Sequence, residues 1–198
     1  MTQNYMDQFG IKCPVVSCED RNILSQIARE SLIFGDTYGV QKILDGTVLN
    51  PWLQSSIPSF VSIYRHDGSE CGCMGSTSTS MSVAQGVSEN AYRAAFHDSR
   101  FVPMCGNQIE DVRIEIALLG SPQLLNGKDE EEILCQLKPN QDGLCLQSGS
   151  HKSFLLPRVW KHLPTARDFL KQLKIKAGLD EDDWQDNFEI TRFSATCW

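Results

Sequence analysis

Three stretches of the chain place apolar residues at the three- and four-residue spacing of an amphipathic helix. Each stretch follows a Ser or Thr that has Asp or Gln three residues later, the pattern of a capped helix start. Gly35 and Gly178 stand where the first and third helices are expected to end. The predicted helices lie within residues 17–35, 82–96 and 165–178.

The clearest strand pattern in the chain lies between Val112 and Leu118, where a large apolar residue stands at every second position. Arg113 and Glu115 alternate there with the apolar set, so the strand is expected to bury one face. Similar reasoning predicts hairpins at 60–74 and 144–156, a short linking helix at 130–137 and a final strand at 188–198. The alternation of the final strand slips near Arg192, which indicates a bulge.

These elements run strand, turn, strand, helix, strand in both halves of the chain, about 17–122 and 123–198. Hairpins dominate, and hairpin strands are antiparallel. We therefore predict an α+β fold in which residues 1–198 form a single domain. Its mainly antiparallel, barrel-like sheet is expected to consist of two related strand-strand-helix-strand halves, with an N-terminal helix in addition.

Composition limits the class of protein. The net charge of −7 argues against a surface that binds phosphate backbones all over. Residues 1–14 lack the basic and apolar regions of a secretory signal, and the longest uncharged stretch, 46–64, contains prolines and serines that exclude a membrane helix. A cytoplasmic protein without membrane contact is expected. Its eight cysteines are expected to stay reduced and mostly buried.

Positive charge is concentrated between His151 and Lys176. This segment contains seven Lys and Arg residues and one acid, so its net charge is +6 and that of the remainder is −13. Arg167, Lys171 and Lys174 share one helical face. Such a stripe could bind RNA, a phosphorylated ligand or an acidic partner. The alternative is a solvated face balanced by the acids at 180–183.

The segment Gly72-Cys73-Met74-Gly75 carries the strongest candidate chemistry. Flanking glycines allow a backbone or ligand to approach closely, and a thiol near a helix start can become a nucleophile. Ser76 and Thr77 follow directly and extend the candidate pocket wall. The alternative is a tight strand exit with a packed, inert thiol. The spacing fits neither a P-loop nor a dinucleotide-binding fingerprint.

Cys71 and Cys73 lie two residues apart, so a regular strand would point both thiols to one face. That arrangement is half of a metal site. No CxxC or HxxxH supplies further ligands, so no metal site is predicted.

Polar residues after the second helix form another candidate cluster. His97 could act as a base toward Cys73, and Asp98 with Arg100 could orient a bound group. The alternative is ordinary helix termination, in which His97 meets the helix dipole and Asp98 begins the next turn. Glu115 lies opposite the apolar set of its strand, where it faces either solvent or a cleft.

Several motifs in order resemble the AMMECR family over residues 17–198. They are Phe60-Val61-Ser62-Ile63, Asp67-Gly68, Gly72-Cys73-Met74-Gly75, Glu89-Asn90-Ala91-Tyr92-Arg93-Ala94-Ala95-Phe96-His97-Asp98-Ser99-Arg100-Phe101, Glu115-Ile116-Ala117-Leu118-Leu119-Gly120-Ser121-Pro122, Asp142-Gly143-Leu144 and Leu155-Leu156-Pro157-Arg158-Val159-Trp160.

The resemblance implies one α+β domain of two related repeats with a cleft near the cysteine motif. The candidate ligand-binding residues are Gly72, Gly75, Ser76, Thr77, Asn90, Asp98, Arg100 and Glu115, and the resemblance supports Asp98 and Arg100 in particular. In the family the motif reads Leu-Arg-Gly-Cys-Ile-Gly, whereas this chain has Glu70-Cys71 in place of Leu-Arg. If the family Arg binds an anion, that role is either absent from this chain or taken over by Arg65, Arg93 or Arg100. Similar prokaryotic proteins work with a Memo-like protein and a radical-SAM enzyme.

Three functions remain open at this stage. The first is an intracellular accessory protein that binds a small ligand or a partner protein at the Gly72–Gly75 motif. The second is a thiol enzyme in which Cys73 attacks, His97 takes a proton and Arg100 holds an anion. The third is a nucleic-acid-associated factor that uses the basic segment 151–176. The residues name no cofactor.

Overall fold

The computed structural model describes residues 5–6, 12–45, 49–77, 79–185 and 187–198, and side chains from Pro14 onward. The chain forms two compact units. The first unit contains Val15–Leu119 and Thr196–Trp198, and the second contains Gly120–Ala195. The second also includes the short antiparallel strands β1 (Tyr5–Met6) and β2 (Lys12–Cys13).

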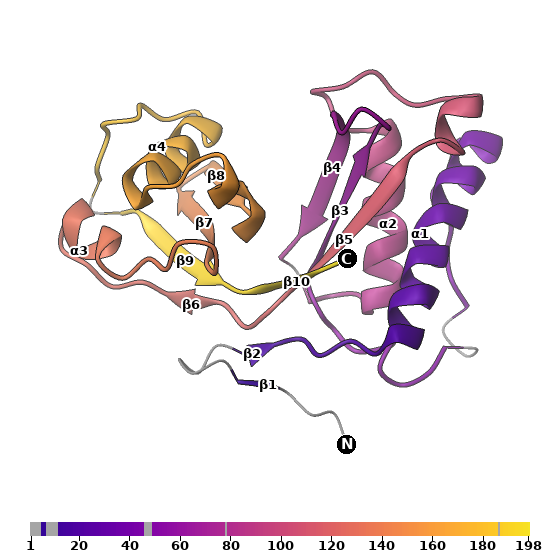
Figure 1. Ribbon diagram of the computed structural model, residues 1–198, viewed down its shortest axis with the longest axis horizontal. Coiled ribbons are helices and arrows are strands. Elements are labelled where there is room, and N and C mark those ends of the chain that lie inside the picture. Colours follow the sequence, from indigo (N-terminus) through magenta and orange to yellow (C-terminus); the bar gives the residue numbers. More distant parts are fainter. Residues whose placement is uncertain (1–4, 7–11, 46–48, 78, 186) are drawn as a thin grey trace. The chain divides into compact units, whose positions relative to one another are not determined.

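The first unit packs two helices on one face of a four-stranded sheet with the order β10-β5-β3-β4 (Figure 1). Strand β3 pairs antiparallel with both β4 and β5. The helices and strands are α1 (Cys18–Tyr38), β3 (Ser59–Tyr64), β4 (Glu70–Ser76), α2 (Val83–Phe96), β5 (Arg113–Leu119) and β10 (Ala195–Cys197), with a short 3-10 helix at Gly106–Ile109.

Capping defines the helix starts as the sequence predicts, because the Ser17 and Ser82 hydroxyls accept hydrogen bonds from the amides three residues later. The predicted end of α1 at Gly35 is wrong. Gly35 lies inside the helix, where a Cβ atom would come within 2.6 Å of the Tyr92 ring. The helix instead ends at Gly39, whose φ of 70° is the left-handed conformation of a helix cap. Gly35 serves close packing between α1 and α2.

The second unit packs its helices against a sheet with the order β6-β9-β7-β8. Its helices and strands are β6 (Gln123–Leu124), α3 (Glu130–Leu134), β7 (Gly143–Ser148), β8 (His151–Leu155), α4 (Ala166–Lys176) and β9 (Glu189–Phe193), with a short 3-10 helix at Pro157–Lys161. Trp160 stacks on Phe169 at 4.0 Å between ring centroids in the core of the unit. Thr165 caps α4, as predicted.

The predicted α+β class with mainly antiparallel strands is confirmed. The barrel-like sheet is corrected, because the described strands form two separate four-stranded sheets and neither closes into a barrel. The predicted final strand is also divided. Its first part is β9 in the second sheet and its last part is β10 in the first, so the irregularity is a change of sheet at Ser194. That the two units form one domain stays a prediction.

No helix within the described ranges is both long and apolar enough to cross a bilayer.

Candidate functional site

A one-residue bulge in β4 decides where the two motif cysteines point. Ile63 pairs with Gly72 and Tyr64 pairs with Glu70, so Cys71 is an extra residue opposite the β3 strand. Cys71 is 2% exposed and belongs to the core beneath the helices. Cys73 lies on the other face. The prediction that both thiols share one face is therefore wrong, because the bulge shifts the alternation by one residue.

Cys73, Ser62 and Glu115 lie directly opposite one another across β4, β3 and β5. We call these three residues the polar row. Val61 and Ile63 point into the core with the helices, so the polar row occupies the sheet face away from α1 and α2. The Ser62 hydroxyl donates to Cys73 Sγ at 3.1 Å. Cys73 and Glu115 are half-buried.

The polar row is bordered on one side by a pair of Tyr and Arg residues and on the other by an apolar pair. Tyr64 and Arg113 pair in register, with the guanidinium 4.3 Å from the Tyr64 ring centroid. Arg113 also lies 3.4 Å from Glu115. Phe60 and Ala117 pair on the opposite side. Ser62 is only 1% exposed, so the accessible polar side chains in and next to the polar row are Cys73, Glu115 and Arg113.

Asp98 and Arg100 contact the free edge of β4 at Cys73. The Cys73 amide donates to Asp98 at 2.9 Å, and Arg100 donates to the Cys73 carbonyl at 3.3 Å. Arg100 also binds Asp98 at 2.7 Å and reaches Glu70 at 3.8 Å. Since β4 is an edge strand, this ion pair occupies backbone groups that would otherwise bond to another strand.

Electrostatics hold the pair in its charged form. Burial alone would raise the pKa of Asp98, but hydrogen bonds from the Arg100 side chain and the Cys73 amide outweigh it and lower that pKa. The hydrogen bond to Asp98 raises the pKa of Arg100. Burial raises the pKa of the Cys71 thiol, which is consistent with its place in the core. Asp98 thus remains a carboxylate at neutral pH.

Both motif glycines lie against other parts of the protein. A Cβ atom on Gly72 would sit 2.1 Å from the Ala94 carbonyl oxygen of α2. A Cβ atom on Gly75 would sit 2.2 Å from the Phe60 ring. Neither glycine has a positive φ. Each therefore permits close packing at this position, and the space beside it is filled by protein.

The remaining predicted site residues are dispersed. Asn90 is buried, and its amide donates to the Ser59 carbonyl and hydroxyl at 3.0 Å. Ser76 ends β4 opposite Ser59, and Thr77 follows it. His97 caps α2, is exposed and packs against Tyr92 at 5.0 Å. No contact between described residues joins His97 to Cys73.

Comparison with known proteins assigns the family. A sequence model of the AMMECR1 family matches residues 25–198. The chain belongs to the AMMECR1 family. A protein of Methanocella arvoryzae is 36% identical over 107 residues, 52% of each chain. A protein of Thermococcus onnurineus is 32% identical over 161 residues, 76% of this chain and 75% of that one. The crystal structure of an uncharacterized protein from Pyrococcus horikoshii has a TM-score of 0.81 at 25% identity over 88% of each chain.

The absent motif arginine of the AMMECR1 pattern has three possible replacements, and the structure separates them. Arg100 contacts the backbone of the motif directly. Arg93 pairs with Glu89 on α2 at 3.6 Å. Arg65 lies in the β3–β4 turn and lines a cavity together with Cys71. Arg100 is therefore the cation attached to Cys73, while Arg65 belongs to a different region.

The cysteines do not form a metal centre in the part of the chain that is described, where no cluster of three His, Cys, Asp or Glu side chains could hold an ion. The seven cysteines whose side chains are described are free thiols. The expectation that most would be buried is wrong. Cys71 is buried, but four are exposed: Cys18, Cys105, Cys135 and Cys197.

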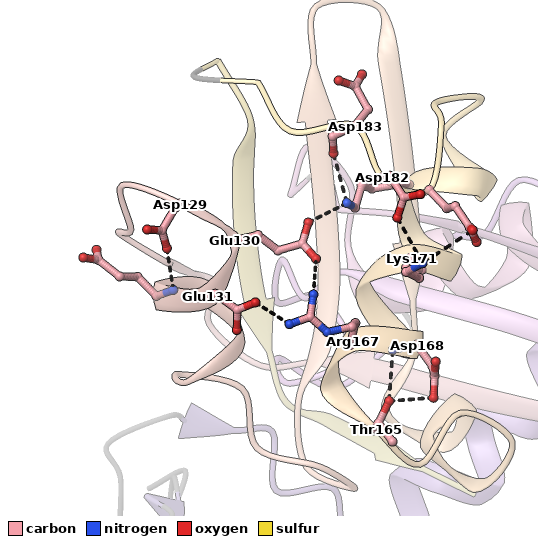
Figure 2. Close-up of polar contacts among 12 residues, drawn as sticks. Asp129, Glu130, Glu131, Thr165, Arg167, Asp168, Lys171, Asp182 and Asp183 are labelled. Carbon is pink, nitrogen blue, oxygen red and sulfur yellow. Dashed lines mark hydrogen bonds and ion pairs between the residues drawn. The ribbon is translucent and has the colours of Figure 1, made fainter.

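The basic stripe on α4 is neutralised by acidic residues of the same unit (Figure 2). Arg167 pairs with Glu130 and Glu131, and Lys171 lies 3.1 Å from Asp182. Lys174 is fully buried and binds Glu130 at 2.7 Å. These cations stabilise the contact of α4 with α3 and with the 180–183 segment, which leaves little free charge for a phosphate backbone.

Sequence reasoning missed Ser62 and Glu70 as members of the site. Ser62 is a polar residue between Val61 and Ile63, which is the only local signal that it faces away from the core. Its partners Cys73 and Glu115 follow from strand register, which the sequence alone did not supply.

Proposed function

We propose that this AMMECR1-family chain is an accessory protein that binds a small ligand or a partner protein at the face formed by the polar row and the Gly72–Gly75 motif. The observation that carries the proposal is the register that aligns Cys73, Ser62 and Glu115 across three strands. Adjacent strands lie about 4.8 Å apart. The half-buried Cys73 thiol and Glu115 carboxylate, on either side of the buried Ser62 hydroxyl, can contact separate polar groups of one bound molecule.

The surrounding contacts support a preformed surface. The Asp98–Arg100 pair holds the Cys73 backbone on both its amide and its carbonyl. Gly72 holds the same strand against α2 through the close approach to Ala94. A surface whose backbone is fixed before binding loses little conformational entropy when a ligand arrives. By resemblance, a Memo-like protein or a radical-SAM enzyme is the proposed partner.

A calorimetric titration with a purified Memo-like protein from the same genome tests the partner form of the proposal. We expect binding to the wild-type chain and at least about tenfold weaker binding to Glu115→Gln and Cys73→Ala. Glu110→Gln is the matched control, because Glu110 is exposed and lies outside the polar row. Equal affinity of all four proteins, or no binding by the wild type, contradicts it. A thermal-shift panel of metabolites on the same variants tests the small-ligand form.

A thiol enzyme is the second candidate, favoured by the Ser62 hydroxyl that donates to Cys73 Sγ. A hydrogen bond to the sulfur stabilises the thiolate, the nucleophilic form. In that case Cys73 is alkylated by iodoacetamide near pH 7 faster than the thiols of the unfolded chain, and Ser62→Ala slows it. A Cys73 rate equal to that of the unfolded chain rejects this candidate.

A further inference from the structure

A cavity of about 440 Å³ lies in the first unit on the opposite side of β4 from Cys73. The β3–β4 turn forms one wall and the connection from α2 to β5 forms the other. Its floor is apolar and belongs to the core, since Cys71, Met104 and Val112 are 2%, 6% and 7% exposed. Clefts of this size with an apolar base and a few polar groups are typical of small-molecule sites.

The wall that follows α2 is fastened to α1. Arg29 donates to the carbonyl oxygens of Ile109 and Val112. The Gly106 amide donates to Asp36 at 3.1 Å. The cavity is therefore held open by contacts that do not involve a ligand, so binding requires little reordering of the wall.

The rim carries both signs of charge. Arg65 lines the cavity, and its charge helps to lower the pKa of Asp67 in the same turn; no hydrogen bond or ion pair of its guanidinium with a described residue is seen. Asp67 is already occupied, because its carboxylate accepts from the Ser69 amide and hydroxyl at 2.8 and 2.6 Å. Among the described residues Asp111 has one ion-pair partner, His66 at 3.6 Å, which carries a charge only when its imidazole is protonated. One cation and one carboxylate are thus available above an apolar floor.

We infer that this cavity binds an α-amino acid with an apolar side chain. The carboxylate of the ligand meets Arg65, its ammonium meets Asp111, and its side chain lies on Cys71, Met104 and Val112. A ligand with a carboxylate alone leaves Asp111 without a cation, and an uncharged ligand leaves both rim charges unused. The Asn107 amide lines the same cavity and supplies a further donor and acceptor. This site does not depend on the polar row.

The methyl group of Met104 reports occupancy of the floor. L-leucine is titrated into the chain labelled with ¹³C-methyl methionine, and Met104→Leu assigns the Met104 signal. We expect a saturable shift of that signal with L-leucine. N-acetyl-L-leucine and L-leucinamide each lack one charge, so we expect about tenfold weaker binding of both.

Variants at the rim test whether Arg65 and Asp111 bind the charged groups of L-leucine. Arg65→Gln and Asp111→Asn are expected to weaken L-leucine binding about tenfold each. Arg93→Gln and Glu110→Gln each remove a charge outside the cavity and are expected to leave binding unchanged. No saturable shift below about 10 mM L-leucine overturns the inference. If both blocked leucines bind as tightly as L-leucine, or if both rim variants bind L-leucine as tightly as the wild type, the inference is also overturned.

Discussion

The two units have similar secondary structure but differ in what their polar side chains contact. Each has a four-stranded, mainly antiparallel sheet with helices, but their polar groups are placed differently. In the first unit, Asp98 and Arg100 bind the backbone of an edge strand next to a half-buried thiol. In the second, Lys174 and its neighbours on α4 are paired with acids of the same unit. A dense run of charge in a sequence can therefore be structural, while a few scattered residues assemble a surface.

The largest effect is expected from Gly72→Ala in the first unit. The added methyl group would lie 2.1 Å from a backbone oxygen of α2, so the helix and the sheet must separate. We expect the free energy of unfolding of this unit to fall by about 3 kcal/mol or more. Urea titration followed through the amide NMR signals of β3, β4 and α2 measures it.

Gly86→Ala is the matched control in the same unit. Gly86 lies within α2, and its added Cβ would meet only the Ser59 hydroxyl at 3.4 Å. Since Ala favours a helix over Gly by about 1 kcal/mol, this variant is expected to be neutral or slightly stabilised. If both substitutions cost the same, close approach of Gly72 to Ala94 is not what holds β4 against α2.

An intermediate effect is expected from Glu130→Gln in the second unit. The change leaves the ammonium of Lys174, which is fully buried, without its carboxylate. The side chain of Glu130 is itself 18% exposed, so we expect a loss of about 2 kcal/mol, below the range for a fully buried pair. Urea titration followed through the amide signals of α3 and α4 measures it.

A double variant separates loss of the pair from loss of a charge. Lys174→Met removes the buried ammonium, so Glu130→Gln added to Lys174→Met is expected to cost less than about 1 kcal/mol. Equal costs of Glu130→Gln in both backgrounds would show that the pair does not stabilise the unit.

The smallest effect is expected from Asp98→Asn, and it depends on pH. The pKa of Asp98 is lower in the folded chain than its ordinary value, so its ionised form stabilises the fold above that value. This contribution is lost as the pH falls through the lowered pKa. We expect Asp98→Asn to cost about 1 kcal/mol at pH 7 and to approach the wild type in stability well below pH 4, by urea titration at each pH. A difference that stays constant with pH contradicts the role of the ionised carboxylate.

Local signals were sufficient for much of the fold. Ser17, Ser82 and Thr165 cap their helices because a hydroxyl and the amide three residues later are close in any such start. The two-residue connection between β7 and β8 was equally accessible, since Gly149 takes a φ of 58° there. These features depend on neighbours within a few residues along the chain.

Features that depend on distant residues were not predictable in the same way. The role of Gly35 requires knowledge that the Tyr92 ring lies against it. The position of Cys71 depends on a bulge, and an insertion of one residue reverses which face a side chain occupies. The pairing of Lys174 with Glu130 joins residues that are far apart in sequence. Asp98 and Arg100 are close in sequence, but their attachment to the Cys73 backbone follows only from the fold.

The sheet of the first unit receives its fourth strand, β10, from residues that follow the whole of the second unit. Ile116 exchanges both backbone hydrogen bonds with Trp198, and the Trp198 indole donates to Ser25 on α1. During synthesis on the ribosome, β5 consequently keeps an unpaired edge until residues 195–198 emerge. The sheet of the first unit is therefore completed only after the second unit has been translated. During that interval the unpaired edge of β5 is open to pairing with another chain.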